Sequence, residues 1–222
     1  MKTKNLNWSL TKIKRTAGIF IAAIILLFAV QSCSKGDGVT VLSSSKYEQL
    51  HKGMQSLWAD HMQWTFTTVD AFFNNPSGLD GNLIRLLQNQ KDIGAAIVPY
   101  YGQAAGNQLA KLLTEHIQGA VPVLTAAKSG NQSALNTALA DWYQNAQDIA
   151  DFLAGANPTN WKQAEMRDMM KGHIDQTTTY AVHLLQKDYT NAIKVFDEAN
   201  HHMAMMADML SEGIAKQFPN KF

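Results

Sequence analysis

The amino-acid sequence predicts an all-α protein, a compact bundle of about six helices built from three helical hairpin repeats. Three observations lead to this prediction. From residue 46 onward, apolar residues recur at steps of three and four, which is typical of helices with one buried face. The sustained alternation of polar and apolar residues that strands need does not occur there. Short segments rich in Asn, Gly, Pro and Ser interrupt the helical pattern at intervals.

Six helices are expected between these interruptions. Their ranges are 46–74, 82–98, 102–128, 131–153, 161–186 and 188–217. Pro99 is expected to end the second helix and Pro122 to bend the third, because proline has no backbone N–H to donate. Gly130 and Asn131 are typical of a helix C-cap followed by a new N-cap, and Asp188 is expected to cap the sixth helix. The short connections predict antiparallel neighbours.

Residues 1–32 have the pattern of a lipoprotein signal peptide. Five basic and no acidic residues lie among the first fifteen, and an apolar run of fourteen residues follows at 17–30. A membrane-spanning helix needs about 18 or more apolar residues, so a permanent span is the weaker alternative. The tetrapeptide VQSC at 30–33 resembles the lipobox of bacterial lipoproteins, including those of the Bacteroidetes type. In such proteins the Cys thiol receives diacylglycerol, the chain is cut before the Cys, and the new amine is acylated, for example with palmitate.

Cys33 is the only cysteine of the chain, and lipidation would explain its presence in an exported protein. The alternative is a free thiol beside an uncut anchor. Ser34 follows where an Asp would commonly signal retention at the inner membrane, so the resemblance implies the outer membrane of a Gram-negative bacterium. Residues 33–45 are therefore expected to be the lipidated Cys with a flexible linker, and residues 46–222 the helical-bundle domain.

Charge and cysteine content exclude several classes of function. Without residues 1–32, the chain keeps 190 residues with 14 basic and 18 acidic side chains, a net charge of −4. This balance argues against a nucleic-acid partner, which calls for a basic patch, and against binding to an acidic lipid surface. With no second cysteine, the domain has no internal disulfide, and its stability must come from an apolar core.

An internal repeat relates the three hairpins. The segment QNQKDI at 88–93 matches QNAQDI at 144–149 in four of six positions, at an offset of 56 residues. The third hairpin keeps an acid, Asp208, and lacks the Asn. A period of about 56 residues is long for a helical solenoid. We therefore favour three hairpins closing into one compact bundle.

Each hairpin also carries a histidine, His61, His116 or His173, in the middle of an apolar stripe. A buried His needs a hydrogen-bond partner, so a polar bond that clamps each hairpin is the favoured interpretation. Imidazole and carboxylate are also ligands of zinc, iron and copper, so a metal or ligand site near a pseudo-threefold axis stays open, as does acid/base catalysis. The polar residues of the repeat that would take part are Asn89, Asp92, Asn145, Asp148 and Asp208.

A second and weaker metal candidate lies in the sixth helix. His201, His202 and Met205 combine imidazole and thioether, which together favour copper. Methionine at helical spacing is more often core filling than a ligand. The sequence shows no phosphate-binding glycine loop, dinucleotide fingerprint or nucleophile elbow.

Several runs of the chain resemble an uncharacterised all-helical family of bacteria. They are LLQNQKDIG, PYYG, LLTEHI, WYQNAQDIADFL, MADMLSEGI and QFP, spread over residues 50–222. The resemblance implies an all-α fold and no established activity. Some members of that family carry the label glycosyltransferase, but a nucleotide-sugar enzyme of the usual folds needs an α/β sheet.

Together these patterns predict a lipid-anchored envelope protein whose helical bundle binds a small ligand, a metal ion or a protein partner without catalysing a reaction. The alternative is a metal-dependent enzyme that uses the repeated His/Asp set. A transition metal is the one cofactor that these side chains suggest, and no residue can be assigned a catalytic role.

Overall fold

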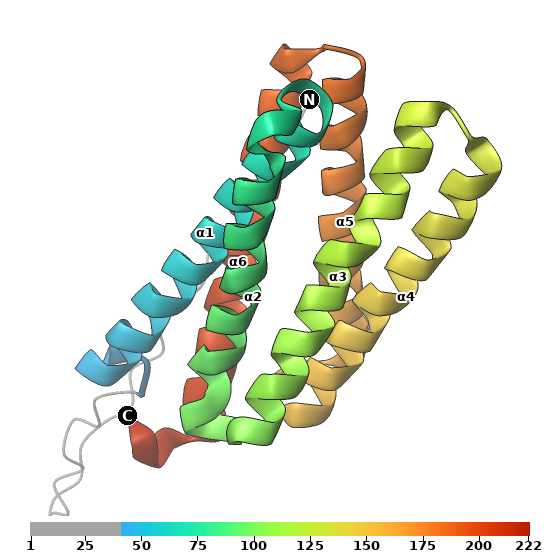
Figure 1. Cartoon of the computed structure of the whole chain (residues 1–222). Helices are drawn as coiled ribbons and strands as arrows, with labels where there is room; N and C mark the ends of the chain where they lie inside the picture. The colour runs from blue at the N-terminus through green and yellow to red at the C-terminus, as the bar shows by residue number, and fades with distance from the viewer. Residues whose placement is uncertain (1–40) are drawn as a thin grey trace, which may run out of the picture. The chain divides into compact units, whose positions relative to one another are not determined.

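The computed structural model describes residues 41–222, and this part of the chain is almost entirely helical (Figure 1). Its six α-helices are α1 (Ser45–Asn74), α2 (Leu79–Tyr101), α3 (Gln103–Ser129), α4 (Gln132–Ala156), α5 (Gln163–Leu185) and α6 (Tyr189–Gln217). Short 3₁₀ turns lie at Val41–Ser43, Pro76–Gly78 and Pro219–Lys221. No strand occurs between residues 41 and 222, so the predicted all-α bundle of six helices is confirmed. The signal peptide and Cys33 lie outside the described residues.

The six helices close into a ring. Each helix packs against the next one along the chain, and α6 returns to pack against α1. α5 also contacts α1 and α3 across the ring, so the odd-numbered helices lie toward its axis. An open solenoid would not bring the last helix onto the first, and the compact arrangement is therefore the one found.

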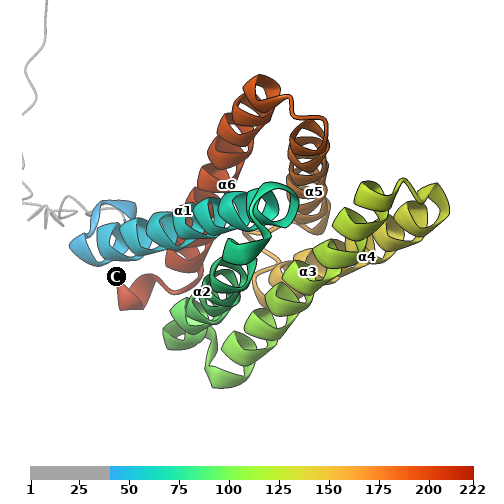
Figure 2. The ribbon, with the colours of Figure 1, turned by 45° about the horizontal axis from the view of Figure 1, so that its top comes forward.

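The bundle has two different ends. The α1–α2, α3–α4 and α5–α6 turns lie at one end, uppermost in Figure 1, which we call the turn end. The start of α1, the C-terminus and the α2–α3 and α4–α5 connections lie at the other, which we call the terminal end. Figure 2 shows the tip of the α3–α4 hairpin standing apart from the other two tips.

The helix boundaries follow the local sequence, with one correction. The predicted end of α2 at Pro99 is wrong, because the helix continues to Tyr101. The N–H of Gly102 bonds the carbonyl of Val98 and closes the last turn past the proline. The predicted caps are confirmed: Gly130 adopts a left-handed conformation (φ 70°) after α3, and the side chains of Asn131 and Asp188 cap α4 and α6.

Close packing fixes the terminal end of the bundle. The buried indole of Trp161, between α4 and α5, lies over Gly213 of α6 and donates to the carbonyl of Met209 at 3.2 Å. The side-chain amide of Asn157 donates to the carbonyl of Gly213 at 2.8 Å. These contacts use the missing side chain of Gly213, and they tie the α4–α5 connection to the last turns of α6. None of the helices within residues 41–222 has the length and apolar character needed to cross a membrane.

Candidate functional site

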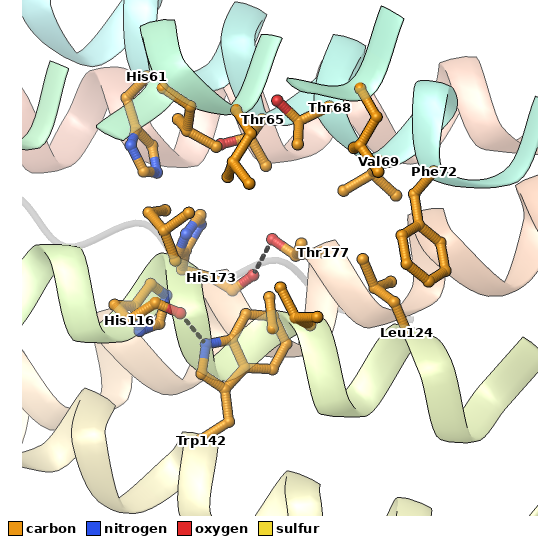
Figure 3. Close-up of a pocket in the computed structure, with 16 residues that line it drawn as sticks. His61, Thr65, Thr68, Val69, Phe72, His116, Leu124, Trp142, His173 and Thr177 are labelled. Carbon is orange, nitrogen blue, oxygen red and sulfur yellow. Dashed lines mark hydrogen bonds between the residues drawn. The ribbon is translucent and has the colours of Figure 1, made fainter. Parts of the chain in front are cut away.

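Three histidines meet near the axis of the bundle. His61 of α1, His116 of α3 and His173 of α5 each occupy the middle of an inner helix (Figure 3). The ring centroids of His61 and His173 are 5.5 Å apart, and those of His116 and His173 are 5.7 Å apart. Each side chain is at most 3% exposed. We call these three residues the His cluster; they converge because the repeat places them at equivalent positions of α1, α3 and α5.

A side-chain amide of the outer helix supports the His in each of the first two hairpins. Asn89 of α2 donates to the carbonyl of Leu57 at 2.9 Å, and Asn145 of α4 donates to that of Leu112 at 3.1 Å. Each carbonyl lies one turn before the His of its helix. The Asn145 side-chain oxygen also lies 2.8 Å from Nδ1 of His116. Asn145 therefore forms the clamp favoured from the sequence, in which a polar side chain holds the His of its own hairpin.

The third hairpin uses a histidine where the first two use an amide. Nε2 of His202 lies 2.9 Å from the carbonyl of Met169, one turn before His173. The repeat pattern contains no counterpart of the Asn in this hairpin, and His202 was instead predicted to belong to a copper candidate. A signal for this role is present in the spacing, because Asn145 and His202 each follow the His of their own hairpin by 29 positions, whereas Asn89 follows His61 by 28.

The three Asp residues of the repeat do not join the His cluster. Asp92 and Asp148 each accept a hydrogen bond from the Gln one turn earlier in their own helix, at 2.8 and 2.9 Å. Asp208 accepts from His51 at 2.7 Å and from Gln55 at 3.0 Å, both in α1. Across residues 41–222, no group of three or more His, Cys, Asp or Glu side chains is arranged to hold a metal ion. The carboxylates thus belong to the surface of the bundle.

The copper candidate is also dispersed. His201 and Met205 are exposed on α6, whereas His202 is turned toward the Met169 carbonyl of α5. Other methionines of α6, Met203 and Met206, are fully buried and fill the core. This matches the common role of methionine as adaptable core filling.

Burial keeps the His cluster uncharged. Loss of hydration lowers the pKa of His61 to about 3 and that of His116 to about 4. Burial, with the neighbouring imidazoles second, holds the pKa of His173 well below its usual range. At neutral pH the cluster therefore consists of three neutral imidazoles, each with one N–H and one lone pair.

The hydrogen-bond network assigns the tautomer of one of these rings. The side-chain N–H₂ of Asn145 is used by the Leu112 carbonyl, so its oxygen must accept from Nδ1–H of His116. Nε2 of His116 then carries a lone pair. It is buried without a hydrogen-bond partner, and so are Nε2 of His61 and Nδ1 of His173. Leaving a buried polar atom unpaired costs about 1–3 kcal/mol, so three such nitrogens in one place require an explanation.

A cavity of about 140 Å³ begins at the His cluster and extends toward the turn end. Its walls come from α1 to α5 and include Thr65, Thr68, Phe72, Leu79, Leu83, Leu86, Ile117, Ala120, Val121, Leu124, Trp142 and Thr177. The Trp142 indole N–H donates to the carbonyl of His116, and the Thr177 hydroxyl donates to that of His173, as Figure 3 shows. These two polar groups are thereby satisfied by backbone, and the space is bounded mainly by carbon. We call it the His cavity.

No family model, curated protein or solved structure matches the chain. The resemblance to an uncharacterised bacterial family stays a prediction, and the site is interpreted from its own geometry.

Proposed function

We propose that this protein is a lipid-anchored envelope protein whose bundle binds a small, largely apolar molecule in the His cavity. The observation that supports binding is an apolar cavity of about 140 Å³ inside the core of the bundle. Engineered apolar cavities of about 150 Å³ in another protein stay dry and admit benzene. The His cavity thus has room for a molecule of roughly that size.

The cost of the cavity supports the same proposal. At roughly 24 cal/mol per Å³, an empty space of about 140 Å³ lowers the stability of the fold by about 3 kcal/mol. A larger apolar side chain at Ala120, in the cavity wall, would remove much of that cost. A ligand that binds the folded state and not the unfolded state stabilises the protein by mass action, and this gain offsets the cost of the cavity.

The cavity has a route of entry near the turn end. Its outer walls include the half-buried Phe72 and Leu83 and the exposed Val121, which is 43% accessible. These residues come from α1, α2 and α3. The entrance is therefore on the side of the bundle where the α1–α2 hairpin faces α3.

The electrostatics favour binding over acid/base catalysis. No Asp, Glu, Lys or Arg of the described chain lines the His cavity. An efficient general base has a pKa near the working pH, whereas burial lowers those of His61 and His116 to about 3 and 4. Such imidazoles are weak bases that act best as neutral hydrogen-bonding groups.

Lipid on Cys33 would be joined to the bundle at its terminal end, because α1 begins there. The 30 residues of α1 correspond to about 45 Å. The His cavity extends toward the opposite end of the bundle, the turn end.

Binding can be tested with benzene and toluene as probes of the full chain in detergent, with Ala120→Leu as the matched cavity-filling control. We expect both probes to raise the melting temperature and to shift the Trp142 indole resonance of the unsubstituted chain, and to have little effect on the control. Because both proteins sit in the same micelles, partitioning of the probe cancels. Unchanged melting and an unchanged indole signal in both proteins would refute cavity binding.

The anchor has its own test in bacteria that express the full chain. We expect radioactive palmitate to label the chain and the protein to fractionate with the outer membrane. Cys33→Ser should abolish the labelling, whereas Ser34→Ala should retain it. Equal labelling of the chain and its Cys33→Ser variant would refute lipidation at this residue.

A further inference from the structure

The inner part of the His cavity contains buried polar atoms without hydrogen-bond partners. The hydroxyls of Thr65 and Thr68 in the cavity wall are two of them, and the His cluster supplies the others. Three ring nitrogens there are buried without partners, one each on His61, His116 and His173. All three residues also line the cavity. A purely apolar ligand would fill the space and leave those nitrogens unpaired. A ligand with a matching polar group would pair at least one of them.

The chemistry of the cluster restricts what this polar group is. Nε2 of His116 offers a lone pair, so its partner must donate a hydrogen. A carboxylate has no hydrogen to donate, and it would bury a charge with no cation in the cavity wall. An ammonium group would equally lack a counter-charge. A hydroxyl donates one hydrogen and accepts at two lone pairs, so it can bond a bare nitrogen and an imidazole N–H together.

Taking the binding function proposed above as given, we propose that the ligand is a small neutral alcohol or phenol that enters with its hydroxyl toward the His cluster. Its apolar body fills the space between Trp142, Leu124 and Phe72, toward the turn end (Figure 3). The cavity volume of about 140 Å³ suits a single six-membered ring. Larger members of the class would extend past Val121 into solvent.

Toluene and phenol test this inference because a methyl group and a hydroxyl have nearly the same size. A cavity without a polar partner rejects phenol, since the hydroxyl loses its water and gains nothing. We expect phenol to bind the full chain at least as tightly as toluene, and benzoate to bind at least tenfold more weakly than phenol at pH 7.5. The readouts are melting temperature and the Trp142 indole resonance, titrated with each probe.

Variants of the cluster assign the effect to the imidazoles. His173→Leu replaces a ring whose Nδ1 is unpaired by an apolar group of similar size. His116→Leu removes the unpaired Nε2 of a second ring, but it also breaks the bond to the Asn145 oxygen and should therefore cost stability. Both variants are titrated as folded protein, so that binding is read separately from stability. Each should weaken phenol binding at least tenfold and leave toluene binding within about threefold. His201→Leu on the exposed face of α6 is the matched control and should change neither.

The outcomes separate the two proposals. Toluene binding with phenol tenfold weaker overturns the hydroxyl inference and leaves the binding function intact. Phenol binding that neither cluster variant weakens overturns it as well, and so does a preference for benzoate. If none of the probes binds, the proposed function itself falls.

Discussion

The stability of this protein should fall steeply as the pH drops from 7.5 to 5, because folding buries three uncharged imidazoles. Burial lowers the pKa of His61 to about 3 and that of His116 to about 4, against an ordinary value of 6.5. Below pH 6.5 the unfolded chain binds protons that the folded chain does not. The stability is therefore fully present above the unfolded pKa, and it is lost progressively as the pH falls toward the lowered folded values.

The size of the loss follows from those pKa values. One pH unit between the unfolded and folded pKa is worth about 1.4 kcal/mol for each group. At pH 5, His61 and His116 each contribute a loss of about 2 kcal/mol, or about 4 kcal/mol together. His173 adds to this in the same direction, since its pKa is also lowered by burial. Domains are typically stable by 5–15 kcal/mol, so this loss is a large fraction of the whole.

Urea unfolding, followed by circular dichroism at pH 7.5, 6.5, 5.5 and 5.0, measures this loss. The range stops at pH 5 because lowered carboxyl pKa values, such as that of Asp151 beside Arg167, affect stability only in more acidic solution. His116→Leu should reduce the pH-dependent loss by about 2 kcal/mol, whereas the exposed His201→Gln should leave it unchanged. A free energy of unfolding that changes by less than about 1 kcal/mol between pH 7.5 and 5.0 would show that the His cluster is hydrated or charged in the folded protein.

Three further predictions test the packing and the site. Asn89→Leu should cost about 1–3 kcal/mol in urea unfolding, because it removes two buried hydrogen bonds, one to the Leu57 carbonyl and one from the Gln90 side chain. The exposed Gln88→Ala should change stability by less than about 0.5 kcal/mol. Equal effects of the two variants would argue against the amide clamp. Gly213→Ala should lower the free energy of unfolding by about 1–3 kcal/mol, since the new methyl group would collide with the Trp161 indole. As the control, Gly53→Ala has open space around it and should stabilise α1 by about 0.5–1 kcal/mol. A Gly213 variant as stable as the original would contradict the close contact between Trp161 and Gly213. Protein purified without chelator should contain zinc, copper and iron well below one atom per chain by elemental analysis, and EDTA should leave its melting temperature unchanged. One tightly bound metal ion per chain would instead support the interpretation of the His cluster as a metal centre.

Much of the fold could be predicted from the sequence because its signals are local. The three-and-four spacing of apolar residues, and the caps at Gly130, Asn131 and Asp188, depend on neighbours within a few positions. The end of α2 differs from the prediction because Pro99 removes one hydrogen bond but does not prevent the next one, from Gly102 to Val98. The rule that a proline ends a helix considers only the hydrogen bond that the proline itself cannot donate, so it misses the bond that continues the helix past Pro99.

The candidate site was only partly predictable. The repeat indicated that His61, His116 and His173 are equivalent, and equivalence in a closed ring brings them together. The same repeat predicted that Asp92 and Asp148 would belong to the site together with the histidines, although both carboxylates face outward. Both Asp residues lie at the edge of the apolar stripe of their helix. At such a position the helical pattern does not determine whether the carboxylate faces the core or the surface, because the neighbouring Gln side chain and the solvent can both bind it.

The helices, their caps and the threefold repetition are specified by the order of residues alone, since each depends on contacts within a few positions or on copies of one pattern. Packing between distant segments was needed to show that α6 closes on α1 and that His202 takes the place of an amide. The same packing places the imidazoles at the end of an apolar cavity. This cavity is the space that the side chains of five helices leave unfilled. Its size and position depend on how those helices pack across the bundle, and the spacing of residues along the chain carries no information about that packing.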